Sequence, residues 1–116
     1  MRPDKSVVII FNSDGMGRAE ARELREILAR KFLGLIEDAR LLPDAICFYA
    51  DGVKLTCDGS PVLAELAALE EKGVRLVVCK TCLDFFDLGD QVRVGVVGGM
   101  TDIITAMWEA DSVVTL

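Results

Sequence analysis

The sequence contains no histidine. Histidine is the side chain that most often moves protons near neutral pH, and it is a frequent metal ligand. Its absence excludes Ser-His and Cys-His catalysis and any metal site with histidine ligands. Aromatic residues are also scarce, at 6% of the chain, whereas hydrophobic residues make up 52%. The core therefore consists mainly of Val, Leu, Ile and Ala, which is typical of parallel strands covered by helices on both faces.

Long hydrophobic runs and an excess of positive charge are also missing. The longest apolar run near the start, Val7 to Phe11, is too short for the core of a signal peptide or for a membrane span. The formal net charge is -6, and an acidic surface repels the phosphates of nucleic acids and anionic membranes. We therefore expect a cytoplasmic protein that binds neither nucleic acid nor membrane. Residues 1–116 suit one domain.

Short hydrophobic runs alternate with segments of helical periodicity. The runs predict strands over 6–12, 45–50, 74–78, 92–97 and 112–116. The periodic segments predict helices over roughly 18–40, 61–72 and 102–109, with a short helix or irregular segment over 83–88. This alternation predicts an α/β fold, a three-layer α/β/α sandwich with a mainly parallel sheet of about five strands.

Several local features of these elements are predicted in more detail. Ser60 is expected to cap the second helix, and Thr101 is expected to cap the last one. The last helix is expected to bury the hydrophobic side chains of Ile103, Ile104, Met107 and Trp108. The polar segment 51–59, which follows the second strand, is expected to be a loop.

The carboxyl ends of parallel strands form the edge of the sheet where ligands bind. The segments predicted at this edge are 12–17, 51–59, 79–82 and 98–101. They contain three of the four cysteines: Cys57, Cys79 and Cys82. Cys47 lies inside a predicted strand, so we expect it to pack in the core. Without an export signal, the cysteines are expected to be thiols, metal ligands or redox groups before they are structural disulfides.

Cys79 and Cys82 form a Cys-Lys-Thr-Cys motif directly after the third predicted strand. A helical turn that begins near Lys80 would favour a thiolate at Cys79, and Lys80 adds positive charge. Cys82 could then attack a sulfur atom carried on Cys79. Disulfide exchange, zinc binding and the packing of two buried thiols are the alternatives, and with them a non-catalytic regulatory or scaffold role. We expect no metal and no cofactor, because a tetrahedral zinc site would need further ligands.

Two other regions are candidates for the same edge. Cys57 approaches Cys79 if the second and third strands end at the same crevice; otherwise it is a half-buried loop thiol. The first turn could bind an anion through its backbone N–H groups, with Lys80 nearby; a glycine turn without a ligand is the alternative. The residues of this candidate anion site are Asn12, Ser13, Asp14, Gly15 and Gly17.

Three segments resemble the DsrE-like family, and most of all the carboxyl-terminal domain of YedF, a sulfurtransferase-like protein of selenium metabolism. They are VVIIFNSDGMG near the start, GVKLTCDGSPVL at 52–63 and GVRLVVCKTCLDFF at 73–86. The resemblance implies a sulfur-relay module, often oligomeric, that carries sulfane sulfur on Cys79 with Cys82 beside it. Cys57 matches the cysteine of the YedF-type loop. The implied partner is a sulfur donor or acceptor protein, such as the TusA-like domain that YedF proteins usually carry and this sequence lacks.

Overall fold

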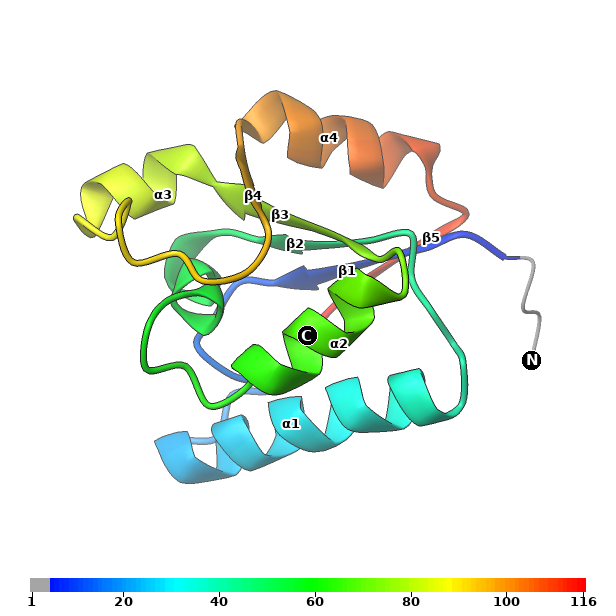
Figure 1. Ribbon diagram of the computed structural model, residues 1–116, viewed down its shortest axis with the longest axis horizontal. Helices are drawn as coiled ribbons and strands as arrows, with labels where there is room; N and C mark the ends of the chain where they lie inside the picture. The colour runs from blue at the N-terminus through cyan, green and yellow to red at the C-terminus, as the bar shows by residue number, and fades with distance from the viewer. Residues whose placement is uncertain (1–4) are drawn as a thin grey trace.

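The computed structural model describes residues 5–116 and contains one sheet with helices on both of its faces (Figure 1). The strands of the sheet are β1 (Val7–Phe11), β2 (Ala45–Phe48), β3 (Arg75–Cys79), β4 (Val96–Gly98) and β5 (Ser112–Thr115). The helices are α1 (Arg22–Asp38), α2 (Leu63–Glu71), α3 (Lys80–Phe85) and α4 (Met100–Glu109), with a 3₁₀ helix, η1 (Ala50–Thr56), after β2.

The five strands of the described chain are all parallel, in the order β4-β3-β2-β1-β5. The chain adds β2, β3 and β4 in one direction and then returns through α4, which brings β5 beside β1. Because crossovers are right-handed, helices that connect strands in one direction along the sheet lie on one face, and the helix of the return connection lies on the other face. Figure 1 shows α1 and α2 below the sheet and α4 above it. The predicted three-layer α/β/α sandwich is confirmed.

The core lies around the three central strands. β2 is fully buried along its length, and β1 and β3 are buried except at their first residues. The Phe11 and Phe48 rings stack with centroids 5.7 Å apart. Cys47 has no exposed surface, and burial raises the pKa of its thiol to about 11. The prediction that Cys47 is a core residue is therefore confirmed.

The start of the first helix was predicted four residues too early. α1 begins at Arg22 rather than at Arg18. The guanidinium of Arg25 donates to the carbonyl oxygens of Ala19 and Glu20, at 2.7 and 3.0 Å, and this holds the preceding residues in a loop. These side-chain bonds to carbonyls five and six residues earlier in the chain override the helical periodicity of the segment.

The second helix and the fourth strand are also shorter than predicted. Ser60 caps a turn, since its Oγ accepts the Val62 N–H at 3.2 Å, and α2 begins only at Leu63. Val92 forms an isolated antiparallel bridge with Cys57, so the parallel pairing of β4 begins only at Val96.

The start and the buried face of α4 also differ from the prediction. The carboxylate of Asp102, rather than the Thr101 hydroxyl, accepts the Gly99 N–H at 2.8 Å, and the helix begins at Met100. Ile103 is buried as predicted, but Trp108 is 83% exposed and Ile104 is 48% exposed. The outer side of α4 therefore carries hydrophobic side chains. Within the described chain, no helix is both long enough and apolar enough to cross a membrane.

Candidate functional site

The cysteine pair lies at the carboxyl end of β3, where α3 begins. Cys79 is the last residue of β3 and has no exposed surface. The short helix predicted over 83–88 starts three residues earlier, at Lys80, where a helical turn was considered. Cys82 lies one turn further and is partly exposed. The two thiols lie next to each other. Of the four cysteines, all of which fall within the described residues, Cys82 alone is not buried.

The thiol of Cys82 receives a hydrogen bond from the backbone of the neighbouring 3₁₀ helix. The Ala50 N–H donates to the Cys82 Sγ at 3.1 Å. Ala50 is the first residue of η1 and has a φ of 51°, in the left-handed region that non-glycine residues seldom adopt. This donor stabilises negative charge on the sulfur atom. Residues 51–56, which were predicted to be a loop, therefore form a helix, and Ala50, which was predicted to end the second strand, supplies its backbone contact to the site.

The electrostatic environment of Cys82 favours the thiol over the thiolate. Partial burial raises the pKa of Cys82 and is the largest effect, and the Ala50 N–H opposes it. The neighbouring Cys79 and the Asp51 carboxylate raise the pKa further. Cys82 is therefore a thiol that becomes a nucleophile as the pH rises.

Lys80 forms an ion pair with a neighbour on the same helix. Its ammonium pairs with the Asp84 carboxylate at 2.7 Å, and both side chains are more than half exposed. No hydrogen bond or ion pair between residues 5–116 joins Lys80 to either thiol. Its expected role in a pocket beside the cysteines stays a prediction.

Cys57 makes its contacts away from the other two site cysteines. Its thiol donates to the Val53 carbonyl oxygen at 3.3 Å, and burial raises its pKa. It lines a separate cavity of about 230 Å³ together with Asp14 and Arg22. No hydrogen bond of the described chain links Cys57 to Cys79 or Cys82. The approach of Cys57 to Cys79 is thus not seen among these contacts.

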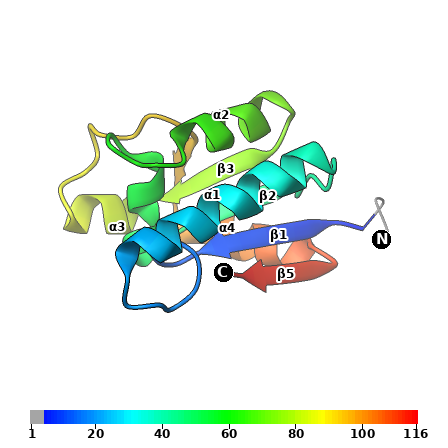
Figure 2. The same cartoon turned by 90° about the horizontal axis from the view of Figure 1, so that it is seen from below.

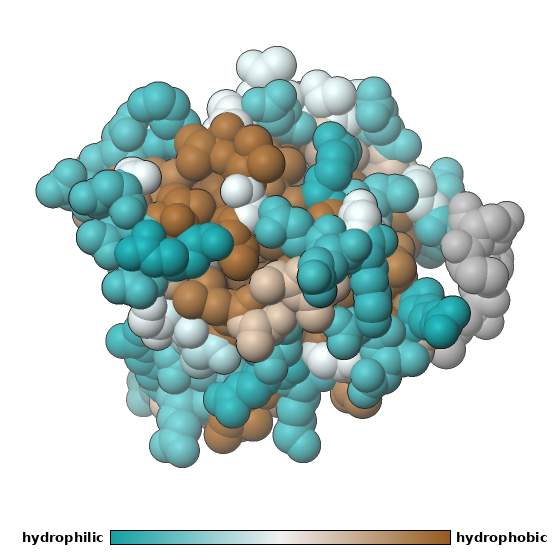
Figure 3. Space-filling view, viewed as in Figure 1, coloured by the Kyte–Doolittle hydropathy of each residue, from teal (hydrophilic) through white to brown (hydrophobic). Residues whose placement is uncertain are grey.

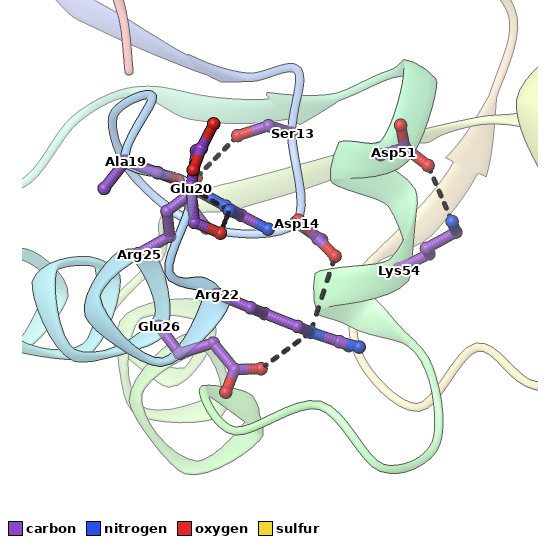
Figure 4. A network of polar contacts seen from close by, with 10 residues as sticks. Ser13, Asp14, Ala19, Glu20, Arg22, Arg25, Glu26, Asp51 and Lys54 are labelled. Carbon is purple, nitrogen blue, oxygen red and sulfur yellow. Dashed lines mark hydrogen bonds and ion pairs between the residues drawn. The ribbon is translucent and has the colours of Figure 1, made fainter.

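The turn that follows β1 is held by charged side chains (Figure 4). The Asp14 carboxylate pairs with Arg25 at 3.2 Å and with Arg22 at 3.6 Å, and the Ser13 hydroxyl donates to the Gly15 carbonyl oxygen at 3.1 Å. A Cβ at Gly15 would lie 2.6 Å from the Arg25 Cβ. Close packing against α1 therefore accounts for this glycine, and the anion-binding role of the turn stays a prediction.

A comparison with protein-family models decides the family. The model described as the DsrE/DsrF-like family matches residues 5–116. The chain belongs to the DsrE/DsrF-like family. The predicted resemblance is thereby confirmed at the level of the family, which is associated with sulfur relay. A closer relation of this DsrE/DsrF-like chain to YedF stays a prediction.

Solved structures show the same fold. The YchN protein from E. coli is 20% identical, with a TM-score of 0.72, and the match covers 97% of this DsrE/DsrF-like chain and 99% of YchN. MTH1491, a protein of unknown function from Methanobacterium thermoautotrophicum, is 20% identical with a TM-score of 0.69, covering 97% of this chain and 100% of MTH1491. A comparison with curated protein sequences finds no match.

Proposed function

We propose that this DsrE/DsrF-like protein carries a sulfane sulfur atom on the pair Cys79 and Cys82. The observation that supports the proposal is a partly exposed thiol next to a fully buried one, with a backbone N–H directed at the exposed sulfur. The exposed thiol can meet a donor, whereas the buried thiol can shelter the sulfur atom from water and from competing thiols.

Loading takes place in two exchanges that are neutral in redox terms. The Cys82 thiolate attacks the outer sulfur of a donor persulfide, R–S–SH, so that a Cys82–S–SH persulfide forms and the donor leaves as R–S⁻. The Cys79 thiolate then attacks the same outer sulfur atom, which gives a Cys79 persulfide and regenerates the Cys82 thiolate. Delivery to an acceptor thiol reverses these steps. The Ala50 N–H stabilises the charge on Cys82 whenever it attacks or leaves.

The resemblance to YedF extends the proposal to selenium and to a partner. Selenium in place of sulfur would follow the same exchanges, with a correspondingly larger gain in mass. A TusA-like domain is the partner that the resemblance implies, as donor or acceptor. We assign no step to Cys57, whose thiol is engaged by the Val53 carbonyl.

Exposed hydrophobic residues support an assembly of several copies. They gather around β4 and the adjoining end of α4 (Figure 3). Val96 is 69% exposed, and Met100, Ile104 and Trp108 recur at four-residue spacing on the outer side of α4. Hydrophobic patches of this kind commonly mark protein interfaces. We propose that this surface, called here the α4 patch, joins copies of the chain.

The carrier proposal predicts that the reduced protein gains one sulfur atom on exposure to polysulfide. Intact-mass spectrometry should show the gain, and dithiothreitol should reverse it, because a thiol reductant attacks a persulfide sulfur. Protein whose thiols were first alkylated with iodoacetamide is the control and should gain nothing. An unchanged mass after polysulfide treatment, together with slow alkylation of all four cysteines, would contradict the carrier proposal.

The raised pKa of Cys82 predicts how loading depends on pH. A thiol below its pKa is mostly protonated, so the loading rate should rise about tenfold per pH unit from pH 7 and level off only above the ordinary value of 9.0. Asp51→Asn removes a charge that raises this pKa, so loading at pH 7.5 should become a few-fold faster. The measurement is the rate of mass gain at each pH.

Asp87→Asn is the matched control for the change at Asp51. It removes the same charge from an exposed position beyond α3, and Asp87 is not among the groups that shift the pKa of Cys82. Equal rates for the two variants would contradict the role assigned to the Asp51 carboxylate.

A further inference from the structure

A hydrophobic groove of about 730 Å³ lies between α1 and the β5 edge of the sheet. Figure 2 shows this face from below, with β5 at the edge of the sheet beside β1 and not covered by α1. Because no helix of the described chain covers β5 on this side, Val114 keeps 39% of its surface exposed, whereas in β1 every residue but the first, Val7, is buried. Ile9 and Val114, which pair in the sheet, lie opposite Phe32 and Ile36 of α1. The groove has the volume and the apolar lining of a small-molecule site.

Two cations mark one end of this groove. Lys5 precedes β1 and Arg40 follows α1, so both lie toward the amino ends of the strands. Neither forms an ion pair with any residue in 5–116, and no described acidic residue lines the groove. The chain has a net charge of -6. Two cations that have no ion-pair partner among residues 5–116 favour an anionic group at that end.

Arg40 occupies a position where glycine is usual. Its φ is 55°, and its N–H donates to the Glu37 carbonyl oxygen while the Leu41 N–H donates to that of Ile36. These two bonds define a Schellman motif, in which the left-handed residue is most often glycine. An arginine here costs backbone strain, and strained residues concentrate at binding sites. The backbone conformation alone would therefore favour glycine at this position, and the Arg40 side chain needs another explanation.

We propose that the groove binds an acyl carboxylate, with its carboxylate at Lys5 and Arg40 and its chain along Ile36 toward Val114. The five residues from Lys5 to Ile9 are separated by four steps that span about 13 Å of extended strand, the length of a medium-chain acyl group. The cationic end of the groove lies at the amino ends of the strands, whereas Cys79 ends β3, and no cysteine lines the groove, so this site is separate from the sulfur site.

Titration calorimetry with decanoate and with 1-decanol tests the proposal. The two probes share their hydrophobic chain, so the carboxylate accounts for their difference. Decanoate should saturate at one molecule per chain, and decanol should bind about tenfold more weakly. Arg40→Gly should weaken decanoate about fivefold and leave decanol unchanged. Because glycine suits the left-handed position, this variant should unfold at the same temperature as the wild type or at a higher one.

A second pair of variants tests the hydrophobic end of the groove. Val114→Glu places a carboxylate in the groove and should abolish decanoate binding, and 39% exposure on an edge strand makes the change tolerable to the fold. Val113→Glu is the matched control, since the next residue along a strand faces the other side of the sheet, and it should bind decanoate normally.

Three results would overturn the proposal. They are no saturable binding of decanoate, equal binding of decanol and decanoate, and a change of assembly mass by light scattering in Val114→Glu. The last would make the groove an interface between copies, whereas the α4 patch lies on the other face of the sheet and should be unaffected by this variant.

Discussion

Replacing Cys82 by serine is expected to slow sulfur loading by about a hundredfold or more. The change removes the atom that forms the new bond, and it leaves no accessible substitute. Cys79 and Cys47 have no exposed surface and Cys57 is 3% exposed. A serine hydroxyl can still accept the Ala50 N–H, so the fold should be kept. The measurement is the rate of mass gain from polysulfide, with circular dichroism to verify folding.

Variants of Cys79 and Cys57 distinguish the residue that first accepts the sulfur atom from the residue that retains it. Cys79→Ser should load at Cys82 but lose its sulfur faster to added reductant, because the sheltered position is gone. Cys57→Ser should load and hold sulfur as the wild type does, since the Cys57 thiol is bonded to the Val53 carbonyl oxygen of η1. If Cys82→Ser loads normally and Cys79→Ser does not, Cys79 meets the donor directly, as the resemblance to the family implies.

The fold was predictable because its signals are local. Contiguous branched residues such as Val7 to Phe11 indicate a strand buried on both faces, and alternation with helices indicates a parallel sheet. The ends of the elements were less predictable, because they depend on individual contacts that the hydrophobic pattern does not encode. Arg25 delays the start of α1 through bonds to backbone carbonyls, and the bridge between Cys57 and Val92 shortens β4. The first contact is local and the second is distant, and the hydrophobic periodicity signals neither of them.

The hydrophobic positions of α4 show a second limit of periodicity. Ile103 and Ala106 face the sheet, whereas Ile104 and Trp108 face outward. Both sets have helical spacing, so the pattern identifies hydrophobic positions without identifying the side that is covered. The outward set forms part of the α4 patch, which is why the prediction that it packs in the core is wrong.

The sequence predicted which cysteines form the candidate site, but not the backbone contacts and the burial that surround them. The motif places Cys79 at a strand end and Cys82 in the following helix. The Ala50 N–H was missed, because a backbone donor from another segment carries no side-chain signal. The left-handed φ of Ala50 was missed as well, because nothing in the sequence marks an alanine for this conformation. The different exposure of the Cys79 and Cys82 thiols depends on how η1 packs against them.

Gly52→Ala is expected to lower the free energy of unfolding by about 3 kcal/mol. Gly52 is buried in η1, and a Cβ there would overlap the carbonyl oxygen of Phe11 and lie 2.6 Å from its carbonyl carbon. These are backbone atoms at the end of a central strand, and the same oxygen accepts the Tyr49 N–H at 3.1 Å. The strand cannot retreat without breaking sheet bonds, so η1 must move instead. Chemical denaturation followed by circular dichroism measures the loss.

The same shift should reach the cysteine pair, because Gly52 and Ala50 belong to one short helix. Displacement of η1 lengthens the bond from the Ala50 N–H to Cys82, and this N–H is the contact that lowers the pKa of the thiol. Gly52→Ala should therefore load sulfur more slowly at neutral pH even where it is fully folded. Gly34→Ala is the matched control: a Cβ there meets nothing within 4 Å, and alanine inside α1 should add up to about 1 kcal/mol. Wild-type stability and loading in Gly52→Ala would mean that η1 does not rest on the end of β1, and the Ala50 contact would then lose its assigned role.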